Sequence, residues 1–203
     1  MDCVNRIDLY TAPVPNGDIG SVFCQLRQKQ IAETVHPELK RQRYYAWKLL
    51  EYAAQNSFGL DPQTLEFTKD STGKWHCDRF CFSLSHCREA VIVAVSSAPV
   101  GVDIECTERT VAPGLANTVL TPAEHNFFDR LSGEEHNRYL LSKWCAKESL
   151  FKAGEFAVFQ PKKLETGSGV REQTLEIGNK TYYCAVAAED LSQLRIFQNI
   201  TLC

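Results

Sequence analysis

The stretch Gly101-Val102-Asp103-Ile104-Glu105 decides how the middle of this chain folds. Its β-branched residues alternate with polar ones, which is typical of a strand whose two faces meet different surroundings. Successive side chains of a strand point to opposite faces, so Val102 and Ile104 should face a core. Asp103 and Glu105 then share the other face, where two carboxylates lie side by side.

A second stretch, Trp144-Cys145-Ala146-Lys147-Glu148-Ser149-Leu150-Phe151-Lys152, has the composition of a helix. Glu148 and Lys152 are four residues apart and therefore share one face of that helix. Two carboxylates from a strand and one from a helix suit a hard cation such as Mg²⁺, and the lysine one turn on suits phosphoryl-group chemistry. On its own, each stretch has an ordinary reading, as a solvated strand face or an ion pair along a helix.

Together, GVDIE and WCAKESLFKA closely resemble the paired signature of the 4′-phosphopantetheinyl transferases, specifically their larger Sfp-type branch. In that family the two stretches read roughly G-(I/V)-D-(I/V)-E and W-x-x-K-E-(A/S)-x-x-K. The resemblance implies that Asp103, Glu105 and Glu148 bind Mg²⁺ and that Asp103 also contacts the substrate. It further implies that Glu148 and Lys152 are catalytic, with Lys152 contacting phosphate as well.

Three upstream stretches extend the resemblance to substrate binding. His36-Pro37-Glu38-Leu39-Lys40-Arg41-Gln42-Arg43 is similar to the family's basic segment, which implies that Lys40 and Arg43 meet the 3′-phosphate and adenosine end of coenzyme A. Thr72-Gly73-Lys74 resembles a G-K-P turn in which the lysine approaches coenzyme A, although Trp75 replaces the proline. Phe82-Ser83-Leu84-Ser85-His86 resembles F-(N/S)-(I/L)-S-H, in which Ser85 and His86 contact phosphate.

The activity that the resemblance implies is that of a holo-[acyl-carrier-protein] synthase type of transferase. The 4′-phosphopantetheine group would pass from coenzyme A to a serine of an apo acyl, peptidyl or aryl carrier protein, releasing 3′,5′-adenosine bisphosphate. Glu148 is the best candidate for the base, directly or through a water. Two alternatives are a non-catalytic module that binds coenzyme A or a carrier protein, and a Mg²⁺-dependent phosphohydrolase. The first would not need the intact carboxylates, and the second would not need the basic segment.

The sequence predicts an α+β fold. Hydrophobic spacing predicts helices over 37–57 and 134–153, the second ended by Gly154, and Thr121 with Glu124 predicts a capping box at another helix start. The resemblance implies a pseudo-dimer of two similar lobes, each a long helix on a small, mainly antiparallel sheet, with residues 1–102 binding coenzyme A, residues 103–203 holding the metal, and the active site at the seam. The expected strands are 4–12, 64–68, 80–84, 91–95, 100–105, 173–178, 181–187 and 194–198.

Composition narrows the class of protein. With 44% hydrophobic and 23% charged residues and a formal net charge of −3, the chain is typical of globular proteins and has no basic field for nucleic acid. No long apolar run indicates a membrane span and no leader-like N-terminus occurs, so we expect a cytoplasmic protein. With both lobes in one chain, a monomer should suffice. A carrier protein would dock around 111–128, where Val111, Leu115, Phe127 and Phe128 precede Arg130.

The nine cysteines favour reduced thiols in a cytoplasmic chain, because their number is odd and no C-x-x-C pair occurs. A zinc site is the alternative at Cys77, Cys81 and Cys87, which cluster beside His76 and His86. Their spacing matches no common zinc finger.

Overall fold

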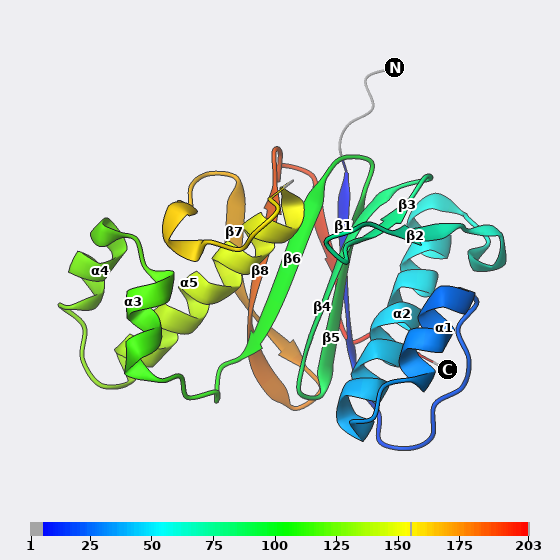
Figure 1. The fold of residues 1–203 in the computed structure, drawn as a ribbon, viewed down its shortest axis with the longest axis horizontal. Helices are drawn as coiled ribbons and strands as arrows, with labels where there is room; N and C mark the ends of the chain where they lie inside the picture. The colour runs from blue at the N-terminus through cyan, green and yellow to red at the C-terminus, as the bar shows by residue number, and fades with distance from the viewer. Residues whose placement is uncertain (1–5, 155, 203) are drawn as a thin grey trace.

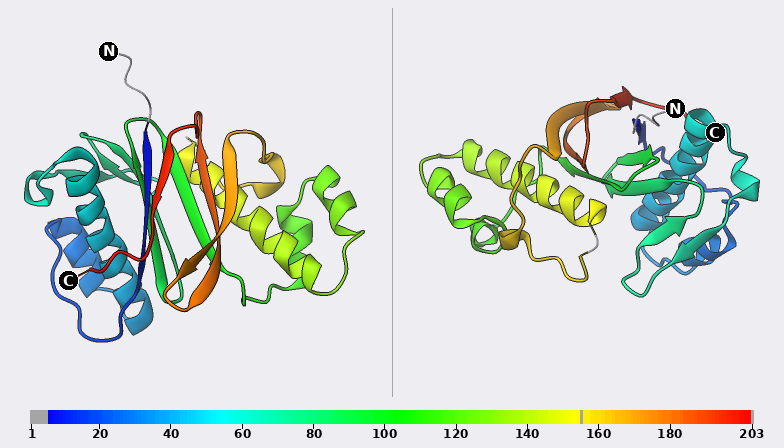
Figure 2. Two further views of the ribbon diagram at one scale, coloured as in Figure 1. Left: turned by 180° about the vertical axis from the view of Figure 1, so that it is seen from behind. Right: turned by 90° about the horizontal axis from the view of Figure 1, so that it is seen from above.

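Two β-sheets lie between two long helices in the computed structural model, which describes residues 6–154 and 156–202 (Figure 1). Helix α2 (Pro37–Phe58) covers the outer face of one sheet, and helix α5 (Glu134–Ala153) covers the outer face of the other. The inner faces of the two sheets share one apolar core. The right-hand view of Figure 2 shows the two sheets from above, with a long helix on either side. The confirmed fold class is therefore α+β with small, mainly antiparallel sheets.

The first sheet has the strand order β4-β5-β1-β9, and the second has the order β6-β8-β7. All neighbours are antiparallel except β9, which pairs in parallel with β1. The strands are β1 (Ile7–Pro13), β4 (Cys81–Cys87), β5 (Ala90–Ser96), β6 (Val100–Cys106), β7 (Val170–Ile177), β8 (Lys180–Ala188) and β9 (Leu194–Phe197), with a separate hairpin of β2 (Phe67–Lys69) and β3 (Trp75–Cys77). Shorter helical elements are α1 (Gln25–Ala32), α3 (Ala116–Val119), α4 (Pro122–Phe128), η1 (Pro62–Thr64), η2 (Pro113–Leu115) and η3 (Pro161–Lys163).

Strand β5 shows why its sequence is almost continuously apolar. Its alternate residues Val91, Val93 and Val95 pack in the core under α2, whereas Ala90 and Ile92 belong to the core shared by the two sheets. Because both faces of β5 are buried, the usual alternation of apolar and polar residues is absent. The long helices also follow from local signals: Pro37 stands in the first turn of α2, and Gly59 ends it in the left-handed conformation at φ 66°.

Most predicted elements are confirmed. Both long helices match within one residue, and both hydrogen bonds of the capping box between Thr121 and Glu124 are present. The strand expected at 64–68 is displaced, since η1 ends at Thr64 and β2 begins at Phe67. Helix α1 and strand β3 were not predicted. The expected strand 4–12 begins at Ile7, and its first two residues lie outside the described part of the chain.

The predicted division between residues 102 and 103 falls inside β6, and β9 from the C-terminal part joins the N-terminal sheet. The similarity of the two lobes stays a prediction. Gly154 follows α5 as expected, but its φ of −86° shows that it does not act as a left-handed cap. Within the described residues, no helix combines the length and the apolar character needed to cross a bilayer.

Candidate active site

Gly101 lets helix α5 approach strand β6 closely. A Cβ atom at this position would lie 1.9 Å from the backbone oxygen of Ser149 and 2.5 Å from the backbone nitrogen of Ala153. These are backbone atoms of α5, so a rotamer change could not relieve the contact. The glycine therefore brings the strand and the helix together just where the two motifs meet.

The alternation expected for β6 is confirmed. Val102 and Ile104 are buried in the core shared by the sheets. Asp103 and Glu105 lie on the opposite face, which α5 covers, and their exposed fractions are only 5% and 7%. Buried carboxylates need compensating partners, so the reading as a solvated strand face is wrong.

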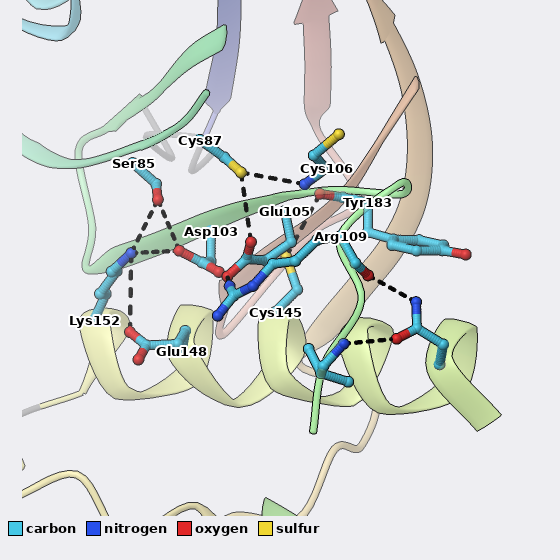
Figure 3. A network of polar contacts seen from close by, with 12 residues as sticks. Ser85, Cys87, Asp103, Glu105, Cys106, Arg109, Cys145, Glu148, Lys152 and Tyr183 are labelled. Carbon is cyan, nitrogen blue, oxygen red and sulfur yellow. Dashed lines mark hydrogen bonds and ion pairs between the residues drawn. The ribbon is translucent and has the colours of Figure 1, made fainter. Parts of the chain in front are cut away.

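Asp103, Ser85 and Lys152 meet at one point between β4, β6 and α5 (Figure 3). Lys152 Nζ lies 2.6 Å from Asp103 Oδ1, and Ser85 Oγ donates a 2.7 Å hydrogen bond to the same oxygen. Lys152 also donates to Ser85 Oγ at 3.3 Å and lies 4.0 Å from Glu148 Oε2. The structure thus brings together four residues that the sequence placed in the site.

Glu105 is held by other partners. Arg109, four residues further on, forms an ion pair with its Oε1, and Cys87 Sγ donates to its Oε2 at 3.5 Å. The hydrogen bond with Glu105 raises the pKa of Arg109 above its usual value. Arg109 was missed in the sequence, where only its distance of four residues from Glu105 could have pointed to it.

The charges of this cluster perturb one another. Burial raises the pKa of Glu148, and the carboxylates of Asp103 and Glu105 raise it further, against the opposite effect of Lys152. Burial lowers the pKa of Lys152, but the ion pair with Asp103 outweighs it, so the net change is upward. Three carboxylates that repel one another form the kind of site that a divalent cation stabilises.

The predicted metal ligands fit Mg²⁺ in their chemistry, because all three supply hard oxygen atoms. As the side chains stand, no group of three or more His, Cys, Asp or Glu residues in the described part of the chain is spaced to hold a metal ion. Lys152 lies between Asp103 and Glu148, and Arg109 engages Glu105. The metal role of the three carboxylates therefore stays a prediction.

A group of cations lies next to this cluster. Burial lowers the pKa of His86 to about 4, and the charges of Lys152, Arg27 and Arg43 lower it further. Arg43 donates through Nη1 to Thr34 Oγ1 at 2.8 Å. Such a concentration of positive charge around a neutral imidazole is suited to a phosphate.

Arg27 is a candidate site residue that the sequence did not reveal. It is 4% exposed on helix α1, donates to the Arg43 carbonyl at 3.0 Å, and lies over the Trp47 ring at 5.2 Å. Burial lowers its pKa to about 10, with a further effect from Arg43. Among the described residues, its buried Nε has no hydrogen-bond partner. A buried guanidinium with a free donor is another indication of an anion site.

Lys74 follows a tight turn in which Gly73 has a φ of 92° and the Asp70 carboxylate accepts from the Lys74 backbone N–H at 3.0 Å. Its Nζ lies 3.4 Å from the Gly154 carbonyl. Lys74 and Lys152 line one cavity of about 330 Å³. An adjoining cavity of about 450 Å³ shares Lys74. The tryptophan that replaces proline in this turn packs against Trp47 at 5.0 Å between ring centroids.

Lys40 lies three residues before Arg43 on α2 and is half-buried. Its side chain makes no contact with another charged group among the described residues, so its role stays a prediction. The zinc alternative finds no support in the described part of the chain, where Cys77, Cys81 and Cys87 are free thiols and no metal-type cluster occurs. Cys3 and Cys203 lie outside the described residues.

We expect His86→Gln to remove a pH dependence of stability. The ordinary His pKa of 6.5 falls to about 4 in the folded protein, so the unfolded chain binds more protons between these values. Stability should therefore fall as the pH is lowered through this window in the parent, and less so in the variant. Urea unfolding at pH 7 and pH 5 measures the difference, with the exposed His36→Gln as control. An equal pH dependence in parent and variant would contradict the assigned environment.

The part of the chain that contains β6 and α5 is similar to a known protein family. Residues 99–189 match the model of the 4′-phosphopantetheinyl transferase superfamily. The chain is 29% identical over 110 residues to a 4′-phosphopantetheinyl transferase of Bacillus subtilis, covering 51% of this chain and 47% of the relative. It is 41% identical over 76 residues to enterobactin synthase component D of Escherichia coli O157:H7, covering 36% of this chain and 35% of the relative.

The same identity of 41% over 76 residues is found with enterobactin synthase component D of Shigella flexneri. The matched part spans about half or less of the length of these curated relatives. The family match contains β6 and α5, the two elements that meet at Gly101. The segment that carries the buried carboxylates and Lys152 is thus similar to 4′-phosphopantetheinyl transferases.

Proposed function

We propose that this protein transfers the 4′-phosphopantetheine group of coenzyme A to a serine of an apo carrier protein and releases 3′,5′-adenosine bisphosphate. The observation that carries the proposal is the meeting of Asp103, Glu148, Lys152 and Ser85 beside a cationic group. Asp103, Glu148 and Lys152 lie within the segment that matches the transferase superfamily, whereas Ser85 and the cationic group precede that segment. Assignment to the Sfp-type branch is part of the proposal.

Coenzyme A carries phosphates at two places, and the site offers cations for both. Ser85, His86 and Lys152 would bind the pyrophosphate, with Lys74 on the wall of the adjoining cavity. Lys40 and Arg43 would bind the 3′-phosphate, and the buried Arg27 next to Arg43 would add a third cation. Charge-assisted hydrogen bonds of this kind are short and strong.

Asp103, Glu105 and Glu148 would hold Mg²⁺, which supplies charge neutralisation for the pyrophosphate. Lys152, which pairs with Asp103 in this structure, would donate to a phosphate oxygen. Burial raises the pKa of Glu148, and repulsion by Asp103 and Glu105 raises it further, which supports a cation at this place. The donor set is all oxygen, as Mg²⁺ prefers.

The raised pKa of Glu148 makes its carboxylate a better proton acceptor than an exposed glutamate. We propose that Glu148 takes the proton of the carrier serine as the serine oxygen attacks the β-phosphorus of coenzyme A. The bond from that phosphorus to the bridging oxygen breaks, and the electron pair leaves with 3′,5′-adenosine bisphosphate. Lys152 and His86 donate hydrogen bonds to the phosphate oxygens that gain charge.

The carrier protein would dock near helices α3 and α4. Phe127 is 51% exposed there, which suits a contact with a partner. Val111, Leu115 and Phe128 instead pack partly into a small apolar cluster, so they serve mainly as core. We propose a monomer that acts in the cytoplasm, with the acyl, peptidyl or aryl carrier as its macromolecular partner.

The experiment that tests this function incubates the protein with coenzyme A, Mg²⁺ and a panel of apo carrier proteins. Mass spectrometry should show one carrier gaining the phosphopantetheine arm, with release of 3′,5′-adenosine bisphosphate. Binding without a mass gain would indicate a non-catalytic module. Phosphate release without a carrier would indicate a hydrolase. A carrier whose serine is replaced by alanine is the control.

A variant series tests the proposed 3′-phosphate contacts. Arg43→Ala should raise the KM for coenzyme A roughly tenfold, because a hydrogen bond to a charged group contributes about 1.5–3 kcal/mol. Lys40→Ala should act in the same direction. With dephospho-coenzyme A, which lacks the 3′-phosphate, the variants should differ little from the parent. Lys29→Ala, an exposed cation on α1, is the control. If the KM rises equally for coenzyme A and for dephospho-coenzyme A, these residues do not contact the 3′-phosphate.

A further inference from the structure

Lys147 is the residue immediately before Glu148, yet its side chain has entirely different surroundings. It is 0% exposed. Its Nζ donates to Glu124 Oε2 at 2.6 Å, to the Val119 carbonyl at 2.8 Å and to the Pro161 carbonyl at 3.1 Å. An ammonium group has three N–H donors, and all three are used here.

The three acceptors belong to three separate segments. Val119 is the last residue of α3, where a cation is favoured by the helix dipole. Glu124 lies in the first turn of α4, and the same Oε2 accepts from the Thr121 backbone N–H at 2.8 Å to complete the capping box. Pro161 begins η3. One buried ammonium therefore holds α3, α4 and η3 against α5.

Pro161 directly follows a short exposed segment that forms a wall of the site. This wall segment, residues 156–160, follows α5. Phe156 and Ala157 line the cavity that contains Lys74 and Lys152. Phe159 packs edge-on against Trp144 at 5.6 Å between ring centroids. Apart from such ring contacts, the wall segment is mainly exposed, so its far end depends on how Pro161 is held.

We propose that Lys147 is a positioning residue, which fixes the wall segment beside the cavity through the Pro161 carbonyl and thereby sets the affinity for coenzyme A. The proposal rests on the proposed function, since it takes the cavity beside Lys152 to be where coenzyme A binds. Lys147 does not touch that cavity. Its effect on the substrate would pass through η3 and the wall segment.

The physical reason is that the ammonium is the counter-charge of Glu124 and the donor that ties the two carbonyls to α5. The other donors are local: Glu124 Oε2 accepts from the Thr121 N–H at 2.8 Å and the Pro161 carbonyl from the Leu164 N–H at 3.0 Å. Without the ammonium, a largely buried Glu124 carboxylate loses its counter-charge and two carbonyls lose a donor. Breaking a buried ion pair is costly, and the remaining donors do not reach back to α5, so α3, α4 and η3 should move toward water. The wall segment would then lose its fixed place, while Glu148 on α5 would keep its own contacts.

The test begins with Lys147→Met, which keeps the length of the side chain and removes the charge. We expect the Tm to fall by about 10 °C, as for a broken buried ion pair in a chain of this size. The dissociation constant for coenzyme A, measured by calorimetry, and its KM should rise about tenfold, with kcat within about threefold of the parent. Hydrogen exchange should become faster in residues 156–164 without any ligand.

A double variant separates positioning from stability. Lys147→Met with Glu124→Gln removes the unpaired charge, so the Tm should partly recover. The Pro161 carbonyl still lacks the donor from α5 and keeps only the local Leu164 N–H, so the weak binding of coenzyme A and the fast exchange of residues 156–164 should remain. Glu124→Gln alone keeps the ammonium on Pro161 and should leave coenzyme A binding near that of the parent. If Lys147→Met does not fold, the double variant is compared with Glu124→Gln instead. Weaker coenzyme A binding and faster exchange in the double variant would then support the positioning role, and equal values would overturn it.

Lys143→Met is the matched control, one turn earlier on the same helix. Lys143 pairs with Glu172 at 2.6 Å near the surface, and its loss should change neither exchange nor binding appreciably. A Lys147→Met variant with a lower Tm but unchanged coenzyme A binding would overturn the positioning role. Unchanged hydrogen exchange of residues 156–164 in Lys147→Met would also overturn the positioning role, whether or not the parent has transferase activity. If the parent fails to transfer but exchange responds as expected, only the proposed function is wrong.

Discussion

Replacing Glu148 with glutamine should abolish transfer and leave the protein at least as stable as the parent at neutral pH. The pKa of Glu148 is raised above its ordinary 4.5 by burial and by the nearby carboxylates. The folded state therefore binds a proton more readily than the unfolded chain, and the stability gained from this is lost as the pH rises from 4.5 through the folded pKa. Glutamine carries no charge and does not incur this loss at pH 7.

The activity should fall by more than about a hundredfold, because Glu148 is both the proposed base and a proposed metal ligand. Carrier modification followed by mass spectrometry measures this loss, and urea unfolding at pH 5 and pH 7 measures the stability. Glu165→Gln, at an exposed position outside the site, is the control and should retain full activity. An active Glu148→Gln protein would rule out both assigned roles, and a clearly destabilised one would contradict the assigned electrostatics.

The three carboxylates should not respond alike to substitution. Removing the Asp103 carboxylate relieves repulsion on Glu148, but it also leaves Lys152 and Ser85 without their shared acceptor. Glu105 similarly supports Arg109 and the Cys87 thiol. A gain in stability, which repulsion alone would predict for all three positions, is therefore expected only at Glu148, whose partner Lys152 lies 4.0 Å away.

The elements with strong local signals were predictable from the sequence. Strand β6 alternates, helix α2 begins at Pro37, and Thr121 forms its capping box with Glu124, because each depends on neighbours within a few residues. The spacing within each motif also predicted which side chains share a face. Asp103 on the strand and Lys152 on the helix do meet in the structure.

The remaining site residues depend on contacts between distant segments. Helix α1 has few apolar positions, so it was not predicted, and its buried Arg27 was missed with it. Lys147 is predictable as helical but not as fully buried, since its acceptors at Val119 and Pro161 are backbone carbonyls that no side-chain pattern reveals. The pairing of Lys152 with Asp103 in place of a metal ion is also a matter of tertiary geometry.

Gly101→Ala should damage stability and activity together. The added methyl group would lie 1.9 Å from the Ser149 oxygen and 2.5 Å from the Ala153 nitrogen, both in the backbone of α5. Either α5 or β6 must shift by a substantial fraction of an ångström or more. Overpacking a close contact costs about 1–3 kcal/mol and sometimes more, and a backbone clash of this severity should fall at or above the upper end.

The same shift would move Lys152 and Glu148 away from Asp103, because α5 carries the first two residues and β6 carries the third. We therefore expect transfer to fall at least about tenfold even under conditions where the variant is fully folded. Gly167→Ala is the matched control, since a Cβ there would meet nothing within 4 Å. Urea unfolding and carrier modification measured on the same samples give the two effects.

A Gly101→Ala protein with parental stability would show that α5 does not contact β6 as closely as the structure has it. A destabilised but fully active protein would show that the contact holds the fold without setting the distance between Asp103 and Lys152. Glu148→Gln provides the opposite case. It removes a carboxylate from α5 without moving the helix, so the variant should lose activity but not stability. The two variants therefore distinguish what α5 contributes through its position from what it contributes through its side chains.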